Sequence, residues 1–98
     1  MKVNALLMDE NDNVATCIRK IETGEAVHYR LGEELFTILA MEEIPYCHKI
    51  SLADIKKGGA VMKYGEIIGE AQQDIPAGHW VSHRNINSVP RDYESELL

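Results

Sequence analysis

Three segments of the chain repeat one pattern of apolar and turn-forming positions. Each has an isoleucine, a glycine three residues later and a valine six residues later, at 21–27, 55–61 and 75–81. The isoleucine is expected in a core, the glycine can reverse the chain at positive φ, and the valine favours a following strand. Asp54 and Asp74 precede the second and third isoleucines and can cap the turns by accepting N–H hydrogen bonds. The pattern therefore predicts turn-then-strand units.

Other short apolar runs between turn residues predict further strands. The expected strands lie at 2–8, 13–18, 26–30, 60–64, 66–71 and 80–84. Residues 33–41 fit a strand or a short helical turn, because periodicity cannot separate the two over so few positions. Turn signals recur at short intervals and no long amphipathic helix is indicated. The fold class is therefore mostly β, a small barrel-like domain with at most one short helix.

Composition narrows the classes of partner and compartment. The 98 residues suit one domain, and 10 basic against 16 acidic residues give a net charge of −6. That charge disfavours nucleic acid and anionic membranes as partners. No apolar run is long enough to span a bilayer and the N-terminus lacks a signal-peptide pattern, so a cytoplasmic location is expected. In that compartment Cys17 and Cys47 are expected to be free, buried thiols.

Two dense polar patches could carry chemistry. Cys47-His48-Lys49 follows a proline, and it can provide a metal ligand, an anion site or simply a surface loop. The second patch is 79–85. In a strand, His79 and His83 would share one face about 13 Å apart, too far to bind one metal ion, while Ser82 would lie on the other face. The alternative is a half-exposed strand with its tryptophan in the core.

No enzyme class follows from residue spacing alone. Lys63 could reach a substrate carboxylate or could be a solvated strand residue. No pair of carboxylates, no Ser-His-Asp pattern and no glycine-rich phosphate loop leading into a helix stands out. The residues alone indicate no more than a small cytoplasmic β domain that could serve as a binding module.

Taken together and in order, the motifs resemble the SAF domain of the altronate and galactarate dehydratase family. The resemblance rests on His48-Lys49 followed by the first Asp-Ile-x-x-Gly turn at 54–58, then 61–65 (Val-Met-Lys-Tyr-Gly), Ile68-Gly69, and the second such turn at 74–78. It implies a small β-clip domain over residues 1–89, followed by an acidic tail at 90–98.

The family resemblance also implies an activity. The SAF domain of this family is either fused to a large dehydratase domain or stands as a separate small subunit, which a chain of 98 residues resembles. Such enzymes remove water from altronate, galactarate or similar sugar acids and depend on a divalent metal, commonly iron. The implied partners are a large dehydratase subunit and a small sugar acid. The alternatives are the small subunit of a sulfolactate sulfo-lyase-like enzyme and a non-catalytic module that binds a small anion or a protein.

One departure from the family pattern affects the expected site. The family's last motif usually reads His-x-His-Asn, and here Ser82 and Arg84 stand at the two histidine positions while the asparagine is kept. Ser82 could bond a substrate hydroxyl and Arg84 a carboxylate. The expected substrate-binding residues are therefore His48, Lys49, Lys63, Ser82, Arg84 and Asn85. The expected metal ligands are His48 and His83.

Overall fold

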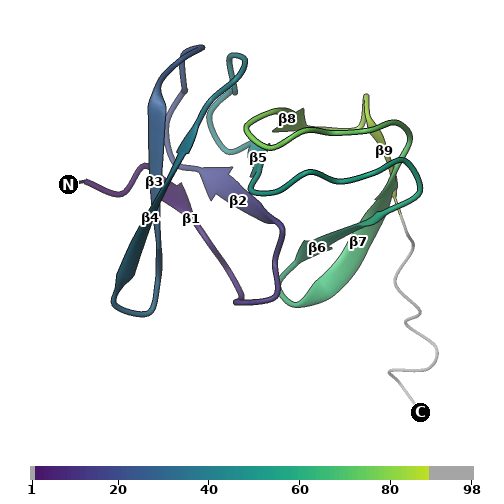
Figure 1. Cartoon of the computed structure of the whole chain (residues 1–98), viewed down its shortest axis with the longest axis horizontal. Helices are drawn as coiled ribbons and strands as arrows, with labels where there is room; N and C mark the ends of the chain where they lie inside the picture. The colour runs from purple at the N-terminus through teal and green to yellow at the C-terminus, as the bar shows by residue number, and fades with distance from the viewer. Residues whose placement is uncertain (1, 89–98) are drawn as a thin grey trace.

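Short antiparallel strands make up the regular structure of the chain (Figure 1). The computed structural model describes residues 2–88. The strands are β1 Ala5–Leu6, β2 Val14–Cys17, β3 Ala26–Leu31, β4 Glu34–Leu39, β5 Lys49–Ser51, β6 Ala60–Lys63, β7 Glu66–Ala71, β8 Trp80–Val81 and β9 Ile86–Ser88. They form a central sheet in the order β1-β2-β5-β8, a β3-β4 hairpin and a β6-β7-β9 sheet. Residues 2–88 contain no helix, which confirms the mostly-β prediction, although the sheets do not close into one barrel.

The repeated turn occurs four times rather than three. The additional copy is 44–50, in which Cys47 occupies the glycine position at φ 66° and Ile50 the valine position. The glycines of the other copies, Gly24, Gly58 and Gly78, have φ between 83° and 87°. This left-handed conformation is easy for glycine and costly for cysteine. The fourth copy escaped the sequence pattern because neither its turn residue nor its last residue matches the other three.

The four copies join in two pairs through equivalent backbone hydrogen bonds. Ile21 and Ile44 exchange both their N–H···O bonds, and Ile55 and Ile75 do the same. In every copy, the N–H of the turn residue donates to the carbonyl four positions before the partner isoleucine. Those four acceptor residues are all buried, and they are Cys17, Ala40, Ser51 and Ala71. The domain is thus built from two structurally similar halves, each with its own hairpin: β3-β4 and β6-β7 lie on opposite sides of the central sheet (Figure 1).

Charged residues just before the isoleucines lock each pair of turns. Asp54 accepts a hydrogen bond from the Ala77 N–H at 2.9 Å, and Asp74 accepts one from the Lys57 N–H at 2.8 Å. The prediction that both aspartates cap turns is therefore confirmed, with each capping the turn of the opposite copy. In the first half the equivalent positions hold Lys20 and Glu43, which form an ion pair at 3.2 Å. In the first half an ion pair therefore takes the place of the two capping hydrogen bonds that the aspartates make in the second half.

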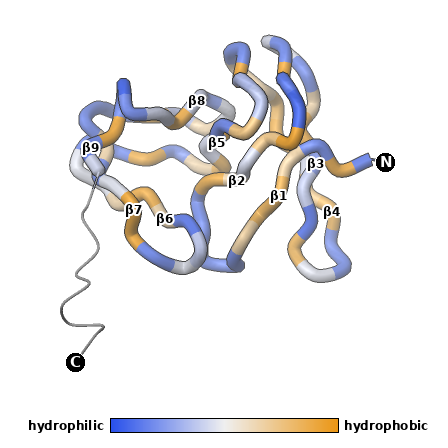
Figure 2. The backbone as a smooth tube through the Cα atoms, turned by 180° about the vertical axis from the view of Figure 1, so that it is seen from behind, coloured by the Kyte–Doolittle hydropathy of each residue, from blue (hydrophilic) through white to orange (hydrophobic). Residues whose placement is uncertain are grey.

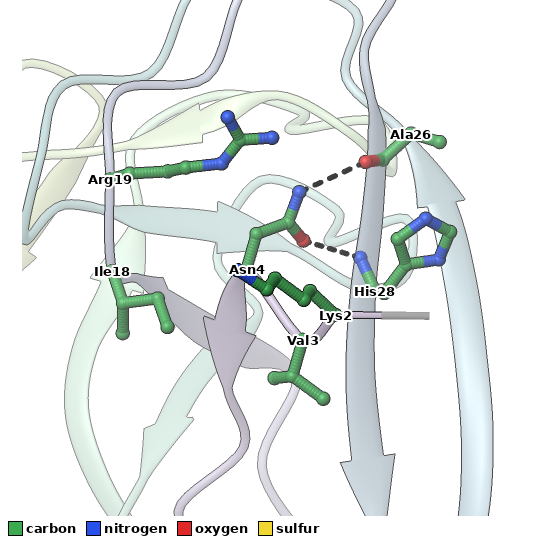
Figure 3. Close-up of a pocket in the computed structure, with 7 residues that line it drawn as sticks. All are labelled: Lys2, Val3, Asn4, Ile18, Arg19, Ala26 and His28. Atoms are coloured by element: carbon green, nitrogen blue, oxygen red, sulfur yellow. Dashed lines mark hydrogen bonds between the residues drawn. The ribbon is translucent and has the colours of Figure 1, made fainter.

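Two asparagine side chains clamp the hairpins to the rest of the chain. The Asn4 amide donates to the Ala26 carbonyl at 3.1 Å and accepts from the His28 N–H at 2.6 Å (Figure 3). Asn13 makes the equivalent pair of bonds to the Ala60 carbonyl and the Met62 N–H. Each amide therefore takes the place of a neighbouring strand along the first strand of its hairpin. These bonds also satisfy the nearly buried side chain of Asn4.

Each half has its own hydrophobic core. The first core contains Ala5, Ala15, Cys17, Ile21, Val27, Ala40, Ile44 and Ile50, and the second Val14, Ile55, Val61, Ala71, Ile75, Val81 and Ile86. All four repeat isoleucines and all four residues at the valine position are buried. In Figure 2 the apolar segments accordingly recur along the tube in both halves.

Several sequence predictions are corrected by the structure. The strand expected at 2–8 is only β1, and the one expected at 80–84 ends at Val81 because a turn follows. Segment 33–41 is the strand β4 and not a helical turn. Cys17 is buried as expected, and burial together with the charge of Glu25 raises the pKa of its thiol to about 11. Cys47, expected to be buried, is exposed, because it occupies a turn.

Two expectations concern the ends of the domain and its compartment. The acidic tail at 90–98 and the last residue of the predicted domain, at 89, lie outside the described residues. Within residues 2–88, no helix is long and apolar enough to cross a bilayer.

We predict that Cys47→Gly stabilises the fold by about 1 kcal/mol, because it removes a left-handed cysteine from a turn that holds glycine in the other three copies. The matched control is Gly24→Ala. A Cβ on Gly24 would meet no atom within 4 Å, so only its φ of 84° opposes the substitution, and a loss of similar size is expected. Urea unfolding of the purified chains measures both changes. A destabilised Cys47→Gly variant would contradict the equivalence of the four turns.

Candidate functional site

A cleft of about 380 Å³ lies between the start of β5, the turn that follows β8, and strands β7 and β9. Its lining residues are His48, Lys49, Ile68, Ser82, His83, Ile86 and Ser88. Four of the residues expected from sequence to form a site, His48, Lys49, Ser82 and His83, therefore lie together. None of the seven lining residues is acidic, although the whole chain carries a net charge of −6. The cleft is chemically suited to an anion.

Trp80 fixes the orientation and the tautomer of His48. The indole Nε1–H donates to Nδ1 of His48 at 3.1 Å, and the two rings meet edge to face at 5.3 Å. Because an indole can only donate, Nδ1 must accept, and the neutral imidazole carries its proton on Nε2. His48 is therefore a hydrogen-bond donor through Nε2. Its position follows from the fourth repeat turn, since it comes directly after Cys47.

Lys49 is a partly desolvated cation at the edge of this cleft. Burial lowers the pKa of Lys49 below its usual value, and the positive charge of Lys63 lowers it further. Lys63 does not line the cleft but lies close enough for its charge to act there, with its Nζ 5.2 Å from the centre of the Tyr64 ring. Bringing two cations together costs free energy that a bound carboxylate would recover.

The segment from Ser82 to Asn85 is a turn and not the continuation of a strand. The Ser82 N–H donates to the side-chain oxygen of Asn85 at 2.9 Å, and the Asn85 amide donates to the Trp80 carbonyl at 2.7 Å. Ser82 also accepts a hydrogen bond from the Arg84 N–H through its Oγ. The expected alternation of faces is therefore wrong, and His83 lies in the same cleft as Ser82. Asn85 holds the turn in shape instead of lining the cleft.

Arg84 is placed beside the site by Trp80. Its guanidinium carbon lies 5.6 Å from the centre of the indole ring, a cation–π contact. Trp80 thus contacts both Arg84 and His48. Arg84 does not line the cleft, but its exposed side chain stands next to it. Of the six predicted substrate-binding residues, three line the cleft, and Lys63, Arg84 and Asn85 support or flank it.

The side chains in the cleft do not fit a metal ion by themselves. Residues 2–88 contain no group of three or more His, Cys, Asp or Glu side chains placed to hold one. Of the two imidazoles that line the cleft, His48 accepts the hydrogen bond from Trp80 Nε1–H at Nδ1 and carries its own proton at Nε2, so neither nitrogen offers a free lone pair. A catalytic metal usually takes about three protein ligands, which His83 alone cannot provide.

A larger hollow of about 510 Å³ lies around Asn4, away from the predicted site (Figure 3). It includes the basic residues Lys2 and Arg19, together with His28. The charge of Arg19 is balanced by an ion pair with Glu25. The side-chain amide of Asn4 is already hydrogen-bonded to the backbone of β3. The smaller cleft is the better candidate site, because its lysine, Lys49, is partly desolvated beside a second cation, Lys63.

Sequence reasoning missed the residues that position the site. Trp80, which the alternative interpretation of 79–85 places in the core, is half-buried against the first core and also contacts His48 and Arg84. Glu42 was not considered at all, and its carboxylate accepts hydrogen bonds from His79 Nδ1 at 2.8 Å and from the Trp80 N–H at 3.2 Å. No local pattern could have identified Glu42, since it acts on a segment far along the chain.

We predict that Lys63→Met raises the pKa of Lys49 towards its usual value of 10.5, because the substitution removes a neighbouring positive charge. Lys57→Met is the control, since Lys57 is an exposed lysine that does not contribute to the shift. Titration of the lysine side-chain NMR signals measures both.

The lowered pKa of Lys49 also determines how the stability of the fold changes with pH. Between the lowered pKa of Lys49 and 10.5 the unfolded chain binds more protons, so stability should rise with pH in that window. Below both values the charged amine opposes folding in full. Lys49→Met should therefore raise the melting temperature at neutral pH, and a lower melting temperature would contradict the desolvated position of Lys49.

Comparison with known proteins agrees with the motifs. The family described as the altronate/galactarate dehydratase SAF domain matches residues 3–89. A galactarate dehydratase (L-threo-forming) of Escherichia coli is 36% identical over 72 residues, covering 74% of this chain and 13% of that protein. An altronate dehydratase of Bacillus subtilis is 36% identical over 86 residues, covering 87% and 16%. An altronate dehydratase of Escherichia coli is 35% identical over 94 residues, covering 96% and 17%.

The chain thus spans less than a fifth of the length of these relatives. The match to the family covers nearly all of the described residues, including both turn pairs and the cleft. On this evidence the chain belongs to the altronate/galactarate dehydratase SAF domain family.

Proposed function

We propose that this chain is the SAF subunit of a cytoplasmic sugar-acid dehydratase, working beside a large catalytic chain on an altronate- or galactarate-type substrate. The observation that carries the proposal is the cleft with two imidazoles, a desolvated lysine and no acidic lining residue. Sugar acids present a carboxylate and several hydroxyls, which call for a cation and hydrogen-bond donors. The names of the relatives, galactarate dehydratase and altronate dehydratase, support this substrate class.

The residues of the cleft suit separate roles in binding. Lys49 would pair with the substrate carboxylate, which would replace the solvent that its amine has lost. His48 would donate from Nε2 to a carboxylate or hydroxyl oxygen, with Trp80 holding the ring in place. Ser82 would bond a hydroxyl, and Arg84 would close over the carboxylate from the side.

In this proposal the small chain binds and orients the substrate, and the large chain carries out α-proton removal and the loss of hydroxide. The divalent metal expected of the family, commonly iron, would be held by the large chain, because the cleft does not provide a ligand set. Contacts with the substrate carboxylate would hold the reacting carbons in position, although the small chain itself would not contact those carbons.

The first test is recovery of the tagged chain from its native cell under conditions that preserve weak complexes. We expect a large dehydratase-like chain in roughly equal amount, and a complex that converts altronate or galactarate to a 2-keto-3-deoxy acid. Release of sulfite from sulfolactate instead would identify a sulfo-lyase. Recovery of the small chain alone would contradict the subunit role.

A substitution in the cleft tests the role of the site. Lys49→Met should raise the KM of the complex for the sugar acid by roughly tenfold or more, because it removes one charge-assisted hydrogen bond to the substrate. The effect on kcat should be smaller. Lys57→Met, which removes an exposed lysine elsewhere, should leave KM unchanged. Neither substitution should prevent recovery of the large chain. Equal KM values for the two variants would exclude Lys49 from substrate binding.

One observation favours a second candidate function, a non-catalytic module that binds a small anion. The lining of the cleft contains hydrogen-bond donors and one lysine but no carboxylate that could act as a base, and Ser82 and Arg84 replace the histidines usual in the family. Binding of galactarate to the isolated chain, with no large chain recovered, would support this alternative.

A further inference from the structure

The two similar halves of the domain differ in how their hairpins are completed. In the second half, β9 adds to the outer edge of β7, pairing Ala71 with Ile86 and Gly69 with Ser88. In the first half, β4 has β3 as its only strand neighbour within residues 2–88. The chain that follows the Ile44 turn forms β5 and runs into the central sheet, so it cannot return to cover β4. The edge of β4 is thus the position where the second half accepts a third strand.

This edge lacks the features that usually prevent strand addition. Strand β4 is six residues long and pairs with β3 without a bulge, whereas the β6-β7 pairing is interrupted by one. It contains no proline or lysine, and its only charged residue is Glu34 at one end. Leu35 and Leu39 are 38% and 54% exposed on the outer face. Exposed, regular and apolar edges are the ones that pair with other strands.

The backbone groups of alternate residues are directed outward from β4. The Ala40 N–H donates to the Glu25 carbonyl at 2.9 Å, in line with the β3-β4 register. Hydrogen bonding alternates along an antiparallel ladder, so residues 38, 36 and 34 also bond towards β3. The N–H and C=O groups of Leu35 and Thr37 consequently point away from β3. The carbonyl of Leu39 lies against Gly78, where a Cβ would come within 2.3 Å of it, so the open edge ends before that residue.

A second copy of β4 fits this open edge. In an antiparallel pairing centred on Phe36, Leu35 and Thr37 would exchange all their outward backbone bonds with the same residues of the other copy. Phe36 would face its counterpart at a non-hydrogen-bonded position, where cross-strand side chains approach most closely. Phe36 already stacks on Tyr29 at 5.5 Å, and both rings are only half-buried. Glu34 would face Ile38, so no carboxylate would be opposed to another.

We propose that the chain forms a two-fold dimer through the β4 edges, giving a continuous sheet β3-β4-β4-β3 with a row of four aromatic rings on one face. An antiparallel second copy opposes no two carboxylates and brings the two Phe36 rings together, which favours a second copy over an unrelated strand. The proposal does not rest on the proposed function, because it concerns neither the cleft nor the large chain.

The first experiment measures the mass of the purified chain by light scattering and by sedimentation over a range of concentrations. We expect twice the mass of one chain. Thr37→Pro should raise the dimer dissociation constant at least roughly tenfold, because it removes an outward N–H while leaving the bonds to β3 intact. Thr37→Val is the matched control and should remain dimeric. Both variants lose the hydrogen bond between His28 Nδ1 and Thr37 Oγ1, so its loss cannot explain a difference between them.

A cross-linking experiment tests the register without depending on the stability of the proline variant. In a Cys47→Gly background, which removes the exposed thiol, Phe36→Cys should form a disulfide-linked dimer under mild oxidation, because residues facing each other across this axis have Cα atoms about 4.5 Å apart. Leu39 is more exposed than Phe36, but Leu39→Cys would lie far from its counterpart, so it should not cross-link. A single-chain mass at all concentrations, a Thr37→Pro variant that stays dimeric, or equal cross-linking at both positions would overturn the proposal.

Discussion

The fold depends on the reciprocal backbone bonds between paired isoleucine turns. Each pair closes a loop with two N–H···O bonds between isoleucines and seals both ends with bonds from the left-handed turn residues. The isoleucine side chains are buried directly beneath these bonds, so burial shields the hydrogen bonds from water while the bonds fix which side chains meet. Few other contacts in so small a domain could set both register and core composition at once.

The paired turns also position the candidate site, which lies where two of the repeated turns end. His48 and Lys49 come directly after the turn of one unit, and Trp80 comes directly after the turn of another. The β5-β8 pairing of Ile50 with Trp80 then brings the two segments together. The site is less favourable for stability than the framework, because Lys49 is desolvated beside another cation. The proposed binding role would account for this local cost.

Sequence reasoning recovered the framework better than the site. The Ile-Gly-Val spacing was sufficient to locate three turns and the capping aspartates, because each depends on local backbone geometry. The fourth turn was missed because Cys47 takes a conformation that sequence rules assign to glycine. The sequence motifs singled out His48, Lys49, Ser82 and His83, which line one cleft, but they did not indicate how these side chains are arranged. That arrangement depends on the Asn85 bonds that end β8 and on a Trp80 contact between segments far apart in the chain.

Strand β2 links the unfolding of the two halves of the domain. Its successive side chains point into different cores: Val14 belongs to the second, whereas Ala15 and Cys17 belong to the first. Two halves with separate cores and separate closed loops would otherwise melt as independent units. Because both cores need β2 in place, neither half can open widely without weakening the other. A four-residue strand thereby couples two structural repeats into one cooperative transition.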